Sequence, residues 1–425
     1  MASVAEVPKA SFRLSMLIYD TRYRSVTIQV IVLALFAAFL IWLTNNTIAN
    51  LAQRDKDINF SFLFQRAGYD IDQQLIPYTN DSTHGRALFV GLANTLAVAF
   101  MACIFATVLG VVAGILRLSK NWLVSRLMTV YIEVFRNVPL LLWIILAFVV
   151  LGETRPQPKD FKVTDEMVAA GEAPAASMWF DQSVAVTNRG TNIPRPFLEH
   201  GLGSVDILTV PVNLSVLLAI VVIIGSVLAN RAVLRRAKAI QEATGIRPTT
   251  WWQSLLILFA PIVLLLWAMG IHLDYPALKG FNFQGGLNIA HSFTALLIAL
   301  TLYSATYIAE AVRAGIMAIS RGQSEAAFAL GLRPGRTMRL IVLPQALRVI
   351  IPPLISQYLN ITKNTTLGMA ISYLDLKGTL GGITLNQTGR ELECMLLMMM
   401  IYLTISLIIS SIMNAYNRSV QLKGR

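Results

Sequence analysis

Residues 88–116, LFVGLANTLAVAFMACIFATVLGVVAGIL, decide the fold of this chain, because they form one apolar run without a charged residue. A helix rises about 1.5 Å per residue, so a run of this length can cross the roughly 30 Å hydrocarbon core of a bilayer. Seven other runs are also long enough to cross it. All eight centre on residues 26–47, 88–116, 131–151, 210–229, 252–271, 291–314, 345–370 and 394–414. The sequence therefore predicts an all-α integral membrane protein with about eight transmembrane helices.

The composition supports the same class of protein. Of the 425 residues, 55% are hydrophobic and 14% are charged, whereas a soluble domain usually has about 25% charged residues. Too few polar side chains remain to cover a soluble fold of this size. The formal net charge of +12 does not indicate a nucleic-acid partner, because lysine and arginine stand in the connections between the apolar runs. We expect contact with membrane lipid and with no nucleic acid.

The distribution of lysine and arginine predicts the orientation of the chain. One alternate set of connections contains 21 of these residues and the other set contains 12. The richer set comprises the N-terminal tail, 117–130, 230–250, 313–348 and the C-terminal tail. Because basic connections tend to stay in the cytoplasm, both termini are placed there. The first run lacks a small-x-small cleavage site and is interpreted as a retained helix.

Motifs for catalysis and metal binding are missing from the sequence. No glycine is followed by lysine, so the phosphate-binding Gly-x-x-x-x-Gly-Lys loop is absent. The four histidines have no second ligand at metal-binding spacing, and Cys103 and Cys394 lie far apart in separate apolar runs. We therefore expect no catalytic residue, no metal site and no cofactor on this chain.

Two patterns inside the runs predict helix contacts. Small residues recur every fourth position on one face of the second run, at Ala102, Ala106, Gly110 and Gly114. Such a face lets another helix approach closely, and we favour packing within the chain over a dimer seam. Glu-x-x-Arg occurs twice, at Glu133/Arg136 and Glu310/Arg313, where each pair can form an anchoring ion pair across one helical turn.

The seventh run contains Pro352 and Pro353 and then the polar residues Lys363, Asn364, Thr365 and Thr366. The prolines predict a kink with freed backbone groups. A lysine inside an apolar span is costly unless it faces a cavity or a partner, so we expect these four residues to line a polar passage. Asn137 is a further candidate for this passage. In the alternative interpretation, Lys363 pairs with a carboxylate such as Asp375 or reaches the outer surface.

The segment Ser324-Glu325-Ala326-Ala327-Phe328-Ala329-Leu330-Gly331-Leu332-Arg333-Pro334 predicts a short helix in a cytoplasmic connection. Ser324 can cap its start, and Glu325 suits the positive end of the helix. Gly331 can end it in the left-handed conformation, with Pro334 just beyond. The helix offers small and apolar side chains for contact with another protein, although it could also lie along the inner membrane surface.

Glu325-Ala326-Ala327, Gly331 and Ile341-Val342-Leu343-Pro344 together resemble the signature of importer permeases of the ATP-binding-cassette family. The segments 91–96, 131–140 and 343–348 are similar to the branch that carries polar amino acids, and those at 188–190 and 193–196 are similar to permeases of general L-amino acid systems. The resemblance implies a type I ABC importer permease fold in a bacterial inner membrane. It also implies import of L-amino acids by alternating access, in the glutamate, glutamine, aspartate and asparagine class.

The resemblance further implies the partners of the chain. These are a cytoplasmic ABC ATPase dimer that carries ATP and magnesium, a second permease subunit of similar fold and a periplasmic amino-acid-binding protein. The contact with the ATPase would be made by Ser324, Glu325, Ala326, Ala327, Phe328 and Gly331. An ion-gradient-driven secondary transporter or channel is the alternative function, and an assembly protein is a third.

The resemblance also implies how the chain is divided into parts. Residues 1–87 form an N-terminal tail, the first transmembrane helix and an outer loop. Residues 88–414 form the permease domain, which departs from the minimal five-helix plan by an insertion at about 152–290 with a periplasmic loop and two extra helices. Its outer segment is rich in proline and charge, and is a docking surface or a mere insertion. Residues 415–425 form a cytoplasmic tail.

Overall fold

The computed structural model describes residues 16–53, 57–163, 167, 173–207 and 210–420. Eight helices in these residues are long and apolar enough to cross a membrane, which confirms the predicted number. They span Tyr23–Ala52, His84–Arg117, Leu140–Phe161, Leu214–Thr244, Trp251–Ala268, His291–Met317, Pro334–Ile371 and Glu391–Arg418.

The chain divides into two compact units, Met1–Phe60 and Ser61–Arg425. The first contains the short helix α1 (Met16–Tyr19) and the long helix α2 (Thr21–Ala52). Nearly every described side chain of α2 is exposed, including Phe39 and Trp42, whose rings stack on each other. An exposed apolar helix of this length suits a lipid environment.

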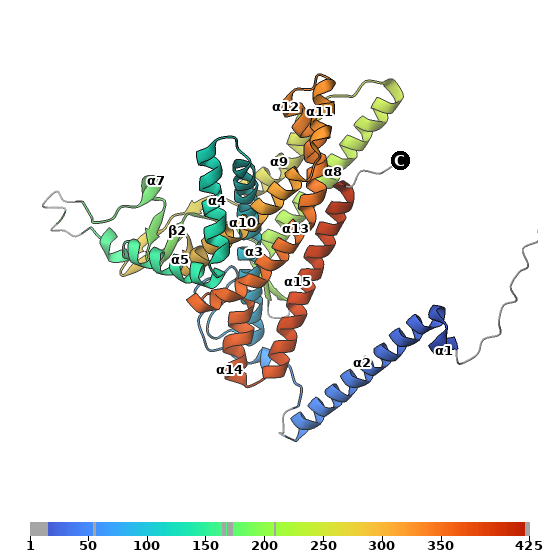
Figure 1. Cartoon of the computed structure of the whole chain (residues 1–425). Helices are drawn as coiled ribbons and strands as arrows, with labels where there is room; N and C mark the ends of the chain where they lie inside the picture. Colours follow the sequence, from blue (N-terminus) through green and yellow to red (C-terminus); the bar gives the residue numbers. More distant parts are fainter. Residues whose placement is uncertain (1–15, 54–56, 164–166, 168–172, 208–209, 421–425) are drawn as a thin grey trace, which may run out of the picture. The chain divides into compact units, whose positions relative to one another are not determined.

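The core of the second unit is built around α3 (His84–Arg117) and α10 (His291–Met317) (Figure 1). A Cβ atom added at Gly110 would lie 2.8 Å from the carbonyl oxygen of Ala305, and one at Gly114 would lie 2.7 Å from that of Ala309. Those spacings leave room only for hydrogen. The small-residue face of α3 therefore packs within the chain, as the sequence favoured.

The predicted helix over 131–151 is wrong, because two helices share that run. Helix α4 (Trp122–Asn137) ends before Val138 and Pro139, and α5 (Leu140–Thr154) begins after them. Val138 has an extended backbone, with φ −102° and ψ 133°. A residue before proline is driven out of the helical region by the proline ring, so α5 crosses α4 instead of extending it (Figure 1).

The seventh span changes its helical geometry along its length. It begins with α12 (Pro334–Thr337) and a π-helical turn η3 (Met338–Val342), and continues as α13 (Leu343–Asn364) through both prolines. The tighter 3-10 helix η4 (Thr365–Ile371) follows. Then come the π-helical η5 (Lys377–Thr384), α14 (Leu385–Thr388) and the last long helix, α15 (Glu391–Val420).

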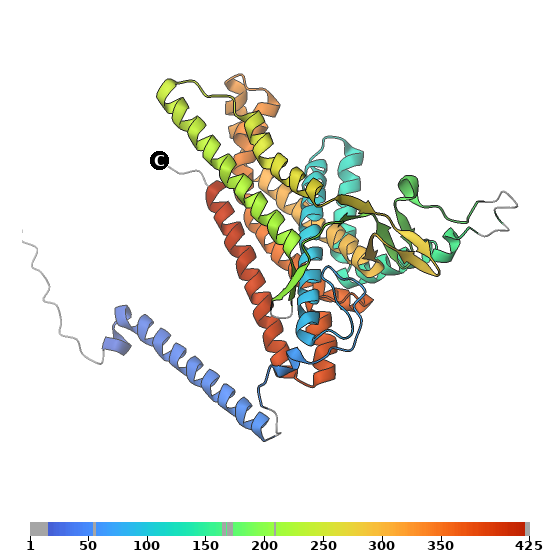
Figure 2. The ribbon, with the colours of Figure 1, turned by 180° about the vertical axis from the view of Figure 1, so that it is seen from behind.

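The insertion contains the two predicted extra helices, α8 (Leu214–Thr244) and α9 (Trp251–Ala268), which pack side by side (Figure 2). It also contains short antiparallel strands that the sequence analysis did not predict. The three-stranded sheet has the order β1 (Ala185–Thr187), β2 (Gly190–Ile193), β9 (Leu287–Ala290). The two-stranded pairs are β3 (Arg195–Leu198) with β6 (Ile271–Asp274), β4 (Ser204–Ile207) with β5 (Val210–Asn213), and β7 (Ala277–Lys279) with β8 (Asn282–Gln284). The helical class holds, and the described parts of the segment 152–209 contain strands.

The N-terminal end of α10 is held by several distant segments. Strand β9 runs directly into His291, and the side-chain oxygen of Gln73 accepts a hydrogen bond from the Ala290 N–H at 2.8 Å. Asn94 of α3 donates to the carbonyl oxygen of Gln73 at 2.8 Å. A single buried glutamine thus ties the loop after the first unit to both central helices.

Candidate functional site

The segment with the capped-helix motif forms α11 (Arg321–Ala329), which follows the end of α10. The predicted cap at Ser324 is wrong by four residues, because Ser320 occupies the N-cap position and Ser324 lies inside the helix. The Ser320 side chain makes no capping hydrogen bond. Two serines precede the apolar part of this helix, and the sequence pattern does not distinguish between them.

Gly331 ends the turn after α11 as predicted. Its φ is +76°, in the left-handed region that glycine enters without steric cost. Its N–H bonds to the carbonyl oxygen of Phe328 at 2.9 Å, and the N–H of Leu332 bonds to that of Ala327 at 3.1 Å. Pro334 then begins α12 at its first turn. The bend therefore satisfies the last carbonyls of α11 and turns the chain back toward the membrane span.

One side of α11 packs on the chain and the other stands free of it. Ala327 is buried, whereas Glu325, Ala326 and Phe328 are exposed. Leu330 just beyond them is 82% exposed. Exposed apolar side chains beside a small residue and a carboxylate are typical of a contact surface for another protein.

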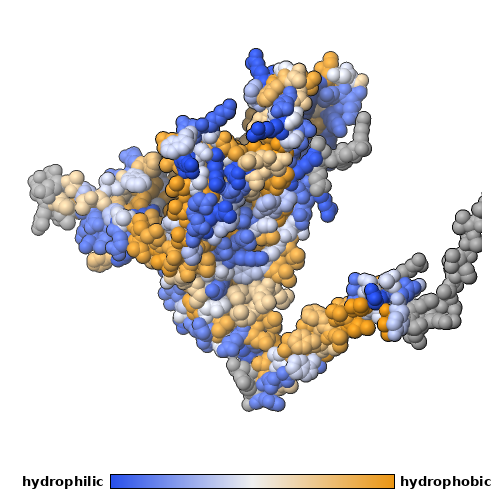
Figure 3. Space-filling view, in the orientation of Figure 1, coloured by the Kyte–Doolittle hydropathy of each residue, from blue (hydrophilic) through white to orange (hydrophobic). Residues whose placement is uncertain are grey.

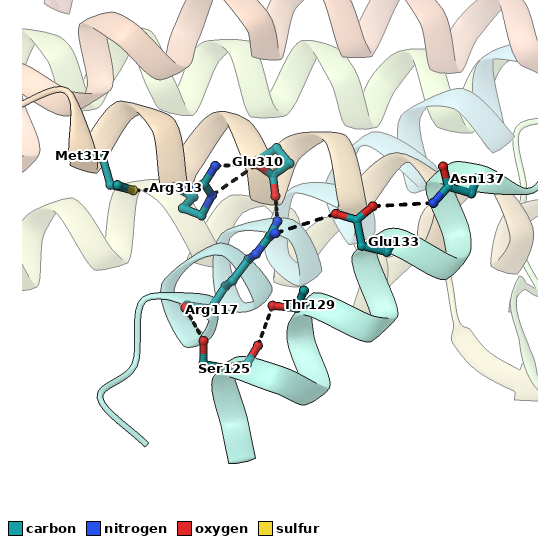
Figure 4. A network of polar contacts seen from close by, with 8 residues as sticks. All are labelled: Arg117, Ser125, Thr129, Glu133, Asn137, Glu310, Arg313 and Met317. Atoms are coloured by element: carbon teal, nitrogen blue, oxygen red, sulfur yellow. Dashed lines mark hydrogen bonds and ion pairs between the residues drawn. The ribbon is translucent and has the colours of Figure 1, made fainter. Parts of the chain in front are cut away.

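A network of charged side chains joins α3, α4 and α10 near the end of α10 (Figure 4). Glu310 pairs with Arg117 and also with Arg313, the latter at 3.0 Å. Arg117 additionally lies 3.8 Å from Glu133 of α4. The predicted pair Glu310/Arg313 is confirmed. Glu133 pairs with Arg117 and not with Arg136, because Arg136 turns toward α10.

Arg136 lies over the ring of Tyr307, with its guanidinium carbon 5.1 Å from the ring centroid. The hydroxyl of Tyr307 shares a hydrogen bond of 2.9 Å with that of Tyr303. Asn137, the predicted passage residue, is exposed and donates a long hydrogen bond of 3.5 Å to Glu133. Neither tyrosine was predicted as a site residue, although their spacing of four residues places them on one face of α10.

The four residues at the end of α13 separate into two environments. Lys363 is exposed, and Asn364 and Thr366 are half-buried. Thr365 is fully buried and donates to Asp375 at 3.1 Å, so its hydroxyl is used inside the chain. The alternative pairing of Lys363 with Asp375 is not formed.

Asp375 instead anchors the segment that follows η4. Its carboxylate accepts hydrogen bonds from Thr365, from the Gly378 N–H and from the hydroxyl of Tyr402. Asp375 lies between two membrane spans, and burial raises the pKa of its carboxyl group to about 6, although these hydrogen bonds act in the opposite direction. The same segment is fixed to α3 where the Leu376 N–H donates to the hydroxyl of Thr95 at 3.0 Å.

Hydrophilic side chains cover part of the face that Figure 3 presents. Figure 3 shows hydrophilic side chains over α4 and the helices beside it, between strongly apolar surfaces. In the described residues no group of three or more histidine, cysteine, aspartate or glutamate side chains could hold a metal ion.

Comparison with known proteins gives one consistent result. The family model described as "Binding-protein-dependent transport system inner membrane component" matches residues 106–422. The glutamate/glutamine/aspartate/asparagine transport system permease protein BztB of Rhodobacter capsulatus is 66% identical, over 100% of both chains. The general L-amino acid transport system permease protein AapQ of Rhizobium johnstonii is 39% identical, over 98% of this chain and 96% of its own.

A third relative, the putative amino-acid ABC transporter permease protein YhdX of Escherichia coli, is 40% identical over 93% of this chain and 94% of its own. All three relatives match nearly end to end, so the insertion and its two helices are included in the likeness. With its eight apolar helices, the chain therefore belongs to the family of binding-protein-dependent transport system inner membrane components, as a multi-pass permease protein.

Proposed function

We propose that this chain forms half of the pore of an ATP-driven importer, and that the conformational change of the ATPase is transmitted to it through α11. The observation that carries the proposal is the geometry of this helix. It buries Ala327 against its own chain, exposes Glu325, Ala326 and Phe328, and is closed by a left-handed glycine. Ser324 lies on the same helix, inside its second turn. An ATPase subunit that seats this helix would move the ends of α10 and α12 together.

The proposal includes an orientation and a set of partners. Both termini and α11 face the cytoplasm, where a pair of ATPase subunits binds ATP and magnesium. A second permease subunit of similar fold completes the pore, and a periplasmic protein delivers the substrate. The membership of the family supports this assembly, because its members serve binding-protein-dependent transport.

Amino acids of the glutamate, glutamine, aspartate and asparagine class are the proposed substrates. The full-length likeness to permeases named for these substrates and for general L-amino acids supports this class. The hydrophilic face over α4 supplies polar groups that such substrates need (Figure 3). Asn137, Lys363, Asn364 and Thr366 are the exposed or half-buried side chains proposed to line the route.

Reconstitution tests the whole proposal. The chain would be co-expressed with the ATPase, the second permease and the binding protein of its own system, and placed in proteoliposomes. Uptake of radiolabelled L-amino acids should require ATP on the side of the proteoliposome membrane that carries the ATPase. It should also require the binding protein on the opposite side. Uptake that follows an imposed ion gradient without ATP, or that needs no ATPase subunit, would contradict the proposal.

A further inference from the structure

Arg136 differs from the other arginines that surround it. Arg117 and Arg313 both pair with Glu310, whereas Arg136 makes no hydrogen bond or ion pair with the residues that the structure describes. It is exposed and rests on the ring of Tyr307 alone. A guanidinium has five N–H donors in a planar fork, and stacking on a ring leaves the edge of that fork available.

The depth of this arginine makes its exposure informative. Tyr303 and Tyr307 lie in the middle third of α10, a span of 27 residues. A cation at the centre of a bilayer is costly, and charged side chains there face a water-filled cavity or a partner. The face of α4 that carries Arg136 is therefore not a lipid surface in the working protein.

The last turn of α4 carries charges of both signs. Glu133 and Arg136 are three residues apart, so their Cβ atoms lie about 5–6 Å from each other on one face. The side chain of Glu133 is 53% exposed, and its contacts with Arg117 and Asn137 are long, at 3.8 Å and 3.5 Å. A carboxylate and a guanidinium thus stand side by side with hydrogen-bonding capacity unused.

We propose that Glu133 and Arg136 form a subsite for the zwitterionic end of an amino acid in transit. Arg136 binds the α-carboxylate through its planar edge, a geometry that guanidinium favours, and Glu133 binds the α-ammonium. The ring of Tyr307 orients the guanidinium plane by stacking, and the hydrogen bond from Tyr307 to Tyr303 orients the ring. The inference rests on the proposed transport of amino acids and names the part of the substrate that this site recognises.

The subsite recognises the α-carboxylate and α-ammonium groups that all α-amino acids share, and does not contact the side chain of the substrate. We therefore expect it to accept acidic and amide substrates alike. An amino acid whose α-carboxylate is converted to an amide should bind poorly, because it lacks the negative group that pairs with the guanidinium.

Equilibrium binding to the purified complex of this chain with its second permease and ATPase tests the subsite, without the binding protein. Radiolabelled L-glutamine would be titrated against the wild type, R136Q, R136K and E133Q. R136Q should raise the half-saturating concentration about 10- to 100-fold, as expected for a lost charge-assisted hydrogen bond. R136K should lose less affinity for L-glutamine, because lysine keeps the positive charge but lacks the planar set of donors of a guanidinium.

Arg126 offers the matched control, since it is exposed on the same helix ten residues earlier. R126Q should bind L-glutamine like the wild type. Unchanged binding in R136Q, or the same loss in R126Q, would overturn the subsite. If R136Q fails to assemble with the ATPase, the binding of L-glutamine by R136K and E133Q decides whether the subsite exists. A wild-type complex that binds no amino acid would instead refute the proposed function.

Cysteine labelling separates the subsite from an interface between permeases. In a background with Cys103 and Cys394 replaced by alanine, N137C should react with a water-soluble thiol reagent in the assembled complex. L-glutamine should slow that reaction at least several-fold, and R136Q should abolish the protection. An unreactive N137C would mean that a side chain of the second permease covers Arg136, and would overturn the proposal.

Discussion

Gly91 lies where α3 closely approaches the segment after η4. A Cβ atom at this position would lie 2.8 Å from the carbonyl oxygen of Asp375 and would also strike the side chain of Thr379. The backbone at Asp375 cannot move aside as a flexible side chain can. The contact therefore fixes how η5 is seated on α3.

G91A should lower the free energy of unfolding by about 1–3 kcal/mol, because an added methyl group overpacks a tight contact. Thermal unfolding in detergent would measure the change. Gly225 of α8 provides the control, since nothing lies within 4 Å of its added Cβ. Equal stability losses in G91A and G225A would show that the close approach does not matter.

The pair Arg117–Glu310 joins the ends of α3 and α10 and is largely shielded from water, with side chains 17% and 21% exposed. A double-mutant cycle with R117M and E310Q should give a coupling energy of about 1–3 kcal/mol. The pair Lys238–Glu242 on α8 is 77% and 68% exposed, and should give under about 0.5 kcal/mol. A coupling for Arg117–Glu310 no larger than that of the control would contradict a structural role for this network.

Asp375 makes the stability of the described structure depend on pH. Its pKa in the folded chain, about 6, is above the ordinary 3.8 of an aspartate carboxyl group, so the folded state binds the proton more tightly. Its contribution is therefore greatest below pH 4 and is lost as pH rises through 6, by about 2–3 kcal/mol. Melting curves from pH 4.5 to 7.5 should show a steeper fall for the wild type than for D375N. Parallel curves would exclude this titration.

At the scale of elements, α11 and its terminating glycine form one unit. Gly331 has open space around it, with nothing within 4 Å of an added Cβ, so only its positive φ resists substitution. G331V should strain the bend by roughly 1 kcal/mol or more and reduce both ATPase binding and substrate-stimulated ATP hydrolysis, while membrane insertion stays intact. G322A, inside α11 with equally open surroundings, is the control. Normal coupling in G331V would count against the proposed contact.

The elements also show which features a sequence can predict. Membrane spans follow from long apolar runs, so their number and approximate bounds were predictable. Pro139 contained the signal for the break between α4 and α5, but the apolar residues on both sides concealed it. The strands of the insertion are three or four residues long, too short for an alternating pattern to stand out.

Tertiary contacts limited the prediction of the site. The positive φ of Gly331 follows from local chain geometry and was predictable. The stacking of Arg136 on Tyr307 joins positions 171 residues apart, and the bond from Thr365 to Asp375 depends on a reversal of the chain after η4. Local spacing carries no information about such pairs.

For the whole molecule, orientation in the membrane is the property to test. In the cysteine-free background, S183C in the outer segment should react with an impermeant thiol reagent in whole cells, whereas S320C at the start of α11 should react only after the membrane is opened. The excess of lysine and arginine on the α11 side is the physical reason. Reaction of S320C but not S183C in intact cells would reverse the topology.

The attachment of α10 at its N-terminal end has a mechanical consequence. Because β9 and Gln73 hold the chain at Ala290, a movement of the other end of α10 would turn the helix about its first turn, as a lever turns about a pivot. Met317 lies about 39 Å from that pivot and Tyr303 about 18 Å, at 1.5 Å per residue. In the proposed coupling, a displacement applied through α11 would therefore reach Tyr303 and its neighbour Tyr307 at roughly half its size. A stroke of several ångströms at the ATPase would become a shift of a few ångströms beneath Arg136, about the reach of one hydrogen bond.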